Sequence, residues 1–184
     1  MPQSGPPITL AGLSFAELAE LASQRRLPPV ERWNPPHCGH SGMQILRDGT
    51  WLHEGRPIER EAMVRLFSTI LRREPDGSHV LVTPVEKLSI DVETAAFLAI
   101  GLTSDGEGHH RRIAFTLNSG DVVVLGPDHP LTPGNEIEGP RLAVRAGLEA
   151  ALSRPVYYEL AELALAAGAS PGIWSGGTFF ALEP

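Results

Sequence analysis

Short turn-forming dipeptides recur along the chain and limit the length of every element between them. Asp48-Gly49, Asp76-Gly77, Asp105-Gly106 and Ser119-Gly120 all stand at the ends of apolar runs. Asp-Gly between such runs is the strongest short hairpin signal, because glycine adopts the positive φ that tight hairpin turns need. The 184 residues include 19 glycines and 17 prolines, which further limit the length of helices and strands. The pattern excludes long uninterrupted helices and predicts many short strands.

The residues between these turns predict an α+β fold with mainly antiparallel sheets. Period-two alternation predicts strands, among them 43–47, 50–54, 79–84, 87–92 and 97–103. A helical period predicts two main helices, at 59–73 and 155–167. A capping box at Ser14 predicts an N-terminal helix that ends near residue 26. Strands and helices do not alternate, which argues against a doubly wound nucleotide fold.

Two other segments are expected to be irregular or only briefly helical. Four prolines interrupt residues 27–42, so this stretch is predicted to be a long loop. Long loops inside a compact domain often carry function, and Trp33 offers a large anchor here. Residues 147–152 are predicted to form a short helical turn.

One hairpin sequence has an echo later in the chain. Ile45–Gly55 resembles Thr116–Gly126, with glycines at 49 and 55 in the first and at 120 and 126 in the second. A duplicated strand–helix unit would give two small subdomains with a cleft between them. We therefore divide the chain into a flexible segment at 1–13, an N-terminal subdomain at 14–83 and a C-terminal subdomain at 84–184. The alternative is that antiparallel hairpins simply look alike.

Charge and cysteine content narrow the classes of partner and compartment. The formal net charge is −7 and no Lys/Arg-rich run occurs, which disfavours binding to duplex nucleic acid. No apolar stretch approaches the roughly 20 residues of a membrane span. The single cysteine, Cys38, cannot form an internal disulfide, and no signal peptide is evident. The expected location is the cytoplasm.

The segment His37-Cys38-Gly39-His40 supplies the reactive groups that an enzyme would use. A thiol beside two imidazoles could bind a metal or act as a nucleophile with a histidine base. The spacing differs from the usual zinc patterns, and a small buried cysteine is the competing interpretation. Neither a phosphate-binding P-loop nor a dinucleotide fingerprint occurs, so no cofactor is expected.

Cationic and aromatic residues suggest a site for an anionic ligand. Lys87 is the only lysine beside 14 arginines, so it could serve as a compact point charge, with Glu86 as its neighbour. Near the C-terminus, Arg154, Tyr157 and Trp174 mix charge with rings that could stack on a ligand. An exposed strand lysine and ordinary core edges are the alternatives.

Several motifs together resemble one bacterial family. These are Trp33-Asn34-Pro35-Pro36-His37-Cys38-Gly39, Thr83-Pro84-Val85-Glu86-Lys87, Arg154-x-Val156-Tyr157-Tyr158-Glu159-Leu160 and Trp174-Ser175-Gly176-Gly177. They resemble the "domain of unknown function 1285" family over roughly residues 28–182. The resemblance implies a two-part α+β protein whose second part is similar to a pleckstrin-homology-type barrel. It also implies a ligand site between the parts and a role in signal transduction, with no established activity.

The leading hypothesis is therefore a non-catalytic sensor or regulator. It would bind a small anionic or nucleotide-like ligand at the interface of the two subdomains. The residues expected to form the site are Trp33, Asn34, Trp51, Arg65, Glu86, Lys87, Arg145, Arg154, Tyr157 and Trp174. Two alternatives stay open, a small-molecule enzyme that uses Cys38 or a histidine cluster, and a protein–protein interaction module. A homodimer is compatible with each of them.

Overall fold

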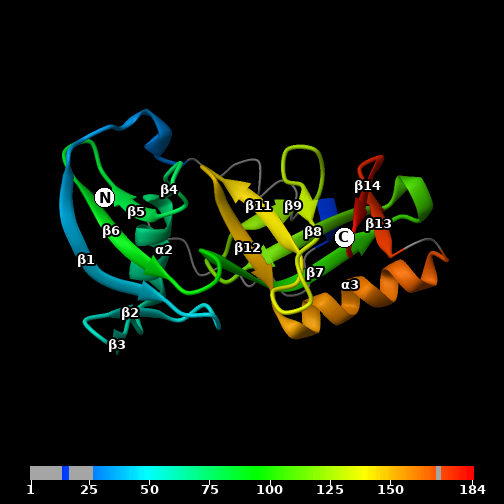
Figure 1. The fold of residues 1–184 in the computed structure, drawn as a ribbon. Coiled ribbons are helices and arrows are strands. Elements are labelled where there is room, and N and C mark those ends of the chain that lie inside the picture. Colours follow the sequence, from blue (N-terminus) through cyan, green and yellow to red (C-terminus); the bar gives the residue numbers. More distant parts are fainter. Residues whose placement is uncertain (1–13, 17–26, 169–170) are drawn as a thin grey trace.

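The structure is a computed structural model that describes residues 14–16, 27–168 and 171–184. The expected flexible segment at 1–13 and most of the expected N-terminal helix lie outside these residues. Within the described residues from 27 onward, two helices and two 3₁₀ turns accompany fourteen strands (Figure 1). In chain order these are η1 (Val30–Arg32), β1 (His37–Ile45), β2 (Trp51–His53), β3 (Arg56–Pro57), α2 (Glu61–Thr69), β4 (Leu71–Arg73), β5 (His79–Val82), β6 (Lys87–Val92), β7 (Phe97–Asp105), η2 (Gly108–His110), β8 (Arg112–Leu117), β9 (Val122–Val124), β10 (Leu131–Thr132), β11 (Arg141–Arg145), β12 (Leu148–Leu152), α3 (Arg154–Ala166), β13 (Gly172–Ser175) and β14 (Thr178–Ala181).

The first subdomain is a six-stranded sheet with the order β3-β2-β1-β6-β5-β4. Alternation along the strands gives the sheet two apolar faces. Ile45 and Leu81 are buried on the face that packs against α2, where the Trp51 ring stacks on Phe67. Val82, on the opposite face, packs with Val30 of η1 in a smaller cluster. The 3₁₀ turn is therefore held against the sheet by burial of apolar surface.

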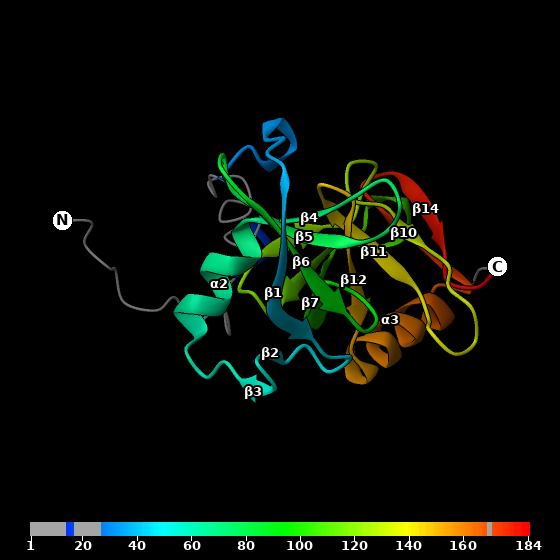
Figure 2. The same ribbon diagram turned by 60° about the vertical axis from the view of Figure 1, so that its left-hand side comes forward.

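The second subdomain is a six-stranded sheet with the order β10-β11-β12-β7-β8-β9, and it curls into a half-barrel (Figure 2). Helix α3 packs against β7 through Val156, Leu160 and Ala164, which are all buried. The C-terminal hairpin β13–β14 is fixed by Ser175. The buried Ser175 hydroxyl accepts from the Ile113 amide at 3.0 Å and donates to the Leu125 carbonyl at 2.7 Å.

The two subdomains share one design, which confirms the α+β fold with two similar halves. In each six-stranded sheet, the strands that come first and last along the chain lie at the centre and pair in parallel, β1 with β6 and β7 with β12. All other strand pairs are antiparallel. The echoed hairpins also have matching turns, with φ of 87° at Gly49 and 85° at Gly120.

Three local expectations from the sequence are wrong. The helix expected at 59–73 ends at Thr69, because Leu71–Arg73 pairs with β5 as a strand. The segment expected to be a helical turn is strand β12, since it pairs with both β7 and β11. The loop expected at 27–42 includes most of β1, which takes its place beside β6.

The sheets also locate the division between the subdomains. The sequence suggested residues 83 and 84, whereas β6, at Lys87–Val92, belongs to the first sheet and β7 to the second. The two lobes lie side by side (Figure 1), and one hydrophobic core contains buried residues of both. Asn118, in the β8–β9 turn, donates to the Gly49 carbonyl in the β1–β2 turn at 3.3 Å, so the two echoed hairpins touch.

Candidate functional site

A groove lies where the two subdomains meet, and it encloses about 370 Å³. The first subdomain supplies Trp33 and Asn34 after η1, together with the segment from Arg72 to Pro75. The second subdomain supplies Ala146 and Gly147, the turn between β11 and β12. A molecule bound in this groove would contact both halves of the protein at once.

Proline residues and a buried valine place Trp33 at the groove. Pro28 and Pro29 precede η1, and their carbonyl groups accept from the amides of Val30 and Arg32 at 2.8 and 2.9 Å. Val30 is buried against the first sheet. The Trp33 amide then closes the turn on the Val30 carbonyl at 3.3 Å, and its ring packs at the edge of the same apolar cluster. The aromatic wall of the groove is thus fixed by backbone geometry and apolar packing.

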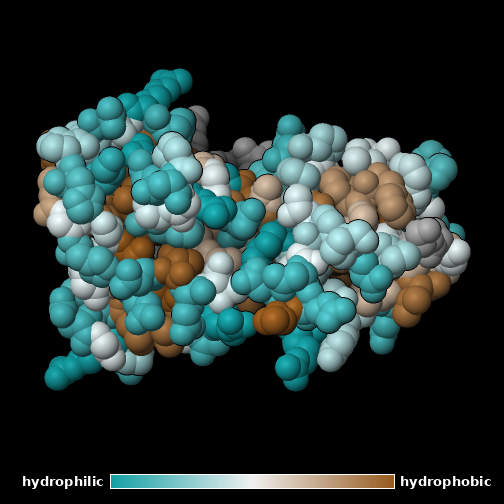
Figure 3. All heavy atoms as spheres, viewed as in Figure 1, coloured by the Kyte–Doolittle hydropathy of each residue, from teal (hydrophilic) through white to brown (hydrophobic). Residues whose placement is uncertain are grey.

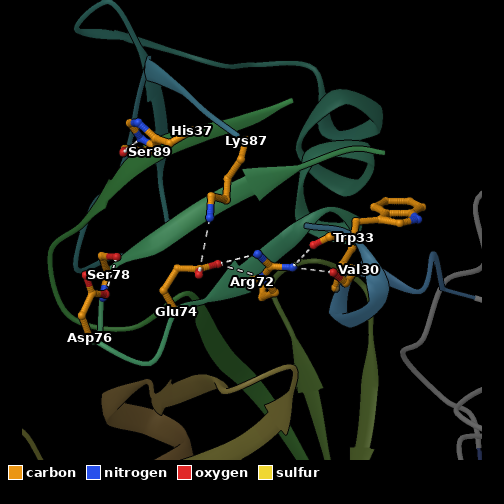
Figure 4. Close-up of polar contacts among 9 residues, drawn as sticks. All are labelled: Val30, Trp33, His37, Arg72, Glu74, Asp76, Ser78, Lys87 and Ser89. Carbon is orange, nitrogen blue, oxygen red and sulfur yellow. Dashed lines mark hydrogen bonds and ion pairs between the residues drawn. The ribbon is translucent and has the colours of Figure 1, made fainter. Parts of the chain in front are cut away.

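The Arg72 side chain, on β4, donates hydrogen bonds that hold η1 and Trp33 against this strand (Figure 4). Its Nη1 donates to the carbonyl groups of Val30 and Trp33 at 2.7 and 2.6 Å. Its Nε and Nη2 lie 2.8 and 2.7 Å from Glu74 Oε1. Lys87 Nζ stands 3.8 Å from the other oxygen of Glu74. Arg72 is therefore a positioning residue that holds the groove wall in place, while Glu74 balances two cations.

Arg73 differs from Arg72 because successive strand residues point to opposite faces. The Arg73 side chain is 39% exposed, and its one ion pair with another described residue joins Nη1 to Glu149 Oε2 at 3.7 Å, beyond hydrogen-bond length. It makes no side-chain hydrogen bond within the described residues. Its backbone amide donates to the Ala146 carbonyl at 3.2 Å. Of the two arginines that line the groove, Arg73 is thus the one with fewer side-chain contacts in the described part of the chain.

The β11–β12 turn closes the groove in a strained conformation. Arg145 pairs with Leu148, which leaves Ala146 and Gly147 as a two-residue hairpin loop. Both have positive φ, 49° at Ala146 and 75° at Gly147. An alanine in the left-handed region costs about 1–2 kcal/mol, and such strain gathers at functional sites.

Comparison with known proteins identifies the family. The N-terminal domain model of the family "Domain of unknown function (DUF1285)" matches residues 28–95, and the C-terminal domain model of the same family matches 96–182. This chain belongs to the DUF1285 family. The match divides the DUF1285 chain between β6 and β7, which is where the two sheets divide.

Two solved DUF1285 structures resemble this one. A DUF1285 family protein from Silicibacter pomeroyi DSS-3 is 41% identical, with a TM-score of 0.80 over 90% of this chain and 92% of that chain. A DUF1285 family protein from Shewanella baltica OS155 is 21% identical, with a TM-score of 0.55 over 67% of this chain and 92% of that one. The second similarity extends to the fold alone.

The DUF1285 fold separates most of the residues that the sequence singled out. Trp33 and Asn34 line the groove. Lys87 does not line it, but its ammonium group lies 3.8 Å from Glu74, which does. Trp51 is a core residue that is 3% exposed, so it is not available to a ligand. Glu86 is exposed in the turn before β6.

The remaining predicted residues lie elsewhere. Arg65 forms an exposed ion pair with Glu61 on α2 at 3.5 Å. Arg145 joins the subdomains beneath the groove, and Arg154 and Tyr157 line a second pocket beside α3. Trp174, in the C-terminal hairpin, packs against His109 of η2, with the two rings tilted by 54° and their centroids 4.1 Å apart. The ten residues therefore do not converge on a single cleft, and Trp33 and Asn34 alone line the groove between the subdomains.

The geometry around Cys38 offers no catalytic pair within the described residues. Cys38 is exposed, contrary to the buried position that its size suggested, and its Sγ donates to the Pro36 carbonyl at 3.2 Å. Its histidine neighbours have other partners, because His37 bonds Ser89 at 2.7 Å and His40 lies 3.3 Å from Asp91. No three metal-ligating side chains gather in the described part of the chain.

Arg72, Arg73 and the Ala146-Gly147 turn were missed by sequence reasoning. The Arg72-Arg73 pair was visible, but a helix through residue 73 would have put it on a solvated face. The strand β4 instead places one arginine against η1 and leaves the other at the groove.

Among the described residues, no helix is both long and apolar enough to cross a membrane.

Proposed function

We propose that this DUF1285 protein is a non-catalytic sensor or regulator that binds a small anionic or nucleotide-like ligand in the groove between its subdomains. The observation that carries the proposal is the meeting of Trp33 and Arg73 in a groove with walls from both halves. An indole supplies a flat apolar surface for a ring, and a guanidinium recognises phosphate or carboxylate oxygens in a bidentate manner.

The state of the two groove arginines supports an anionic ligand. Arg72 is engaged by two carbonyl groups and a carboxylate, so it holds the groove wall in place and is not proposed to bind the ligand itself. Arg73 has a single long contact with Glu149. A ligand phosphate or carboxylate would compete with Glu149 for this guanidinium and would offer the shorter bond.

The position of the groove supports a regulatory role in signal transduction. Bound ligand would touch the Ala146-Gly147 turn, which directly follows Arg145. Arg145 Nη2 donates to the Ser68 carbonyl of the other subdomain at 2.8 Å. Ligand occupancy could therefore change the packing between subdomains, because any ligand that prefers one arrangement shifts the equilibrium toward it.

The proposed location is the cytoplasm, and the proposed partner is a small molecule rather than duplex nucleic acid. A single cysteine fits a reducing compartment, and the net charge of −7 opposes binding to a polyanion. Electrophoretic mobility of a DNA duplex at low salt checks the second point. A stable complex at micromolar protein would contradict it.

A thermal-shift screen of the full chain tests the proposed function. The probes are mononucleotides, cyclic dinucleotides and small polycarboxylates. A ligand at 100 times its Kd should raise the free energy of unfolding by about 2.7 kcal/mol. Arg73→Gln should weaken binding of any hit at least tenfold. The matched control is Arg56→Gln on β3, an arginine outside the groove, which should leave the affinity unchanged. Equal losses in both variants, or no hit that responds to Arg73→Gln, would overturn the proposal.

A further inference from the structure

The second subdomain has a larger groove that is separate from the first and encloses about 650 Å³. One wall is the loop from Gly134 to Pro140, between β10 and β11. The opposite wall is the start of α3, with Arg154, Tyr157 and Tyr158. Leu152 and Leu182 contribute apolar side chains. None of these residues lines the groove between the subdomains, so the two grooves are separate surfaces.

The loop wall is held in shape by its own hydrogen bonds. The Asn135 side-chain oxygen accepts from the amides of Ile137 and Glu138 at 3.0 and 2.8 Å, and the Asn135 carbonyl accepts from the Gly139 amide at 2.9 Å. Arg141 donates to the Glu138 carbonyl at 2.7 Å. A preorganised wall lowers the entropy cost of binding.

This wall presents a large apolar side chain to solvent. Ile137 is 84% exposed at the loop tip, and Tyr158 across the groove is 56% exposed. In the space-filling view, an apolar patch stands among polar residues where α3 begins (Figure 3). An exposed isoleucine opposite an exposed tyrosine offers apolar surface that a partner's side chain could cover.

The charged residues around Ile137 and Tyr158 indicate the kind of partner that this groove would bind. Glu136, Glu138 and Glu183 line the groove together with Arg154. Glu138 also lies 3.8 Å from Arg141 Nη2, so Glu136 and Glu183 supply the negative charge that a partner would meet. A second copy of this acidic chain would bring further negative charge to the surface. A cationic segment would instead be steered toward it and held by charge pairs around an apolar contact.

We propose that this groove docks a basic peptide segment of a partner protein, with one bulky apolar side chain packed between Ile137 and Tyr158 and flanking Lys or Arg residues on the glutamates. The apolar contact supplies the anchor, and the carboxylates select positive flanks. Surface pairs of this kind weaken with salt, so the interaction should depend on ionic strength.

Fluorescence anisotropy with two labelled probe peptides tests the proposal on the full chain. The first probe is the nonapeptide KRKLFKRKG, and the second is its acidic counterpart EDELFEDEG. The basic peptide should bind with a Kd below about 100 μM at low salt and at least fivefold more tightly than the acidic one. Ile137→Ser should weaken binding at least fivefold. Thermal unfolding of each variant confirms that it is folded.

Two double variants of equal charge separate docking from general attraction to an acidic protein. Glu136→Gln with Glu183→Gln removes two carboxylates that line the groove, and Glu159→Gln with Glu162→Gln removes two from α3 that do not. The first pair should weaken the basic peptide at least fivefold and the second pair less than twofold. Equal losses from both pairs, equal binding of the acidic peptide, or no binding at 1 mM would overturn the proposal.

Discussion

Arg145 of the second subdomain donates from Nη2 to the backbone carbonyl of Ser68 at the end of α2, at 2.8 Å. The same guanidinium lies 3.6 Å from the buried Asp121 carboxylate and 5.0 Å from the centroid of the Phe97 ring. One side chain thus neutralises a buried charge and satisfies a carbonyl that the helix leaves without an intrahelical donor. Through the Ser68 carbonyl, this side chain links the two halves of the protein.

Replacing Arg145 should destabilise the whole protein. Arg145→Gln leaves Asp121 buried beside a neutral amide, and loss of one partner of a buried pair costs about 3 kcal/mol or more. Urea unfolding of the full chain measures the change. The control is Arg65→Gln, which breaks an exposed ion pair with Glu61 and should cost under about 1 kcal/mol. Similar losses in the two variants would show that the link at Ser68 contributes little.

The C-terminal hairpin should depend on one hydroxyl group. Ser175→Ala removes both bonds of the buried Ser175 side chain and leaves the Ile113 amide and the Leu125 carbonyl without this partner. The expected cost is about 1–3 kcal/mol. Ser153→Ala is the comparison, because the Ser153 side chain makes no capping bond at α3. Thermal melts in which the two variants coincide would contradict this account of the hairpin.

The two echoed turns should respond differently to the same substitution. Gly49→Ala and Gly120→Ala both place a Cβ at positive φ, which costs about 1 kcal/mol. At Gly49 the new Cβ would also lie 2.6 Å from the Asn118 amide nitrogen, whereas at Gly120 the nearest atom is 3.7 Å away. Gly49→Ala should therefore be the more damaging change in chemical denaturation. Equal costs would mean that Asn118 moves aside freely.

Protonation of His79 should destabilise the folded state. Burial, followed by the positive charge of Arg73, lowers the pKa of His79 below its ordinary value of 6.5. The unfolded chain therefore binds a proton more readily, and stability is lost as the pH falls through about 6.5. The urea midpoint of each protein is measured from pH 8 to pH 5 and expressed relative to that protein's own midpoint at pH 8. The midpoint of His79→Gln should fall less over this range than that of the unmodified protein. A variant curve parallel to that of the unmodified protein would exclude His79 as the cause.

Local sequence signals predicted the hairpins but not the central pairings. Asp48-Gly49 and Ser119-Gly120 are contiguous signals, and both turns formed as expected. The parallel contact of β12 with β7 has no such signal, because it joins distant segments. Tertiary pairing of this kind overrides the helical tendency of Ala150 and Ala151.

The candidate site was predictable only in part for the same reason. The proline-rich frame around Trp33 marked one wall of the groove in the sequence. Its other wall, Ala146 and Gly147, comes from the second subdomain and carries no motif. Trp51 and Trp174 have the residue type that ligands favour, but the fold uses them in the core and in the C-terminal hairpin. Residue chemistry alone does not say which rings share a cleft.

The parallel pairing of first with last strand has a consequence for the order of assembly on the ribosome. His37 pairs with Lys87, and Phe97 pairs with Ala150, so the centre of each six-stranded sheet waits for the last strand of that sheet to be synthesised. Hairpins can form early, but loop closure over such separations makes folding slow. Each half of the nascent chain therefore exposes unpaired central strands until its last strand emerges, which is the interval in which chaperones would be needed.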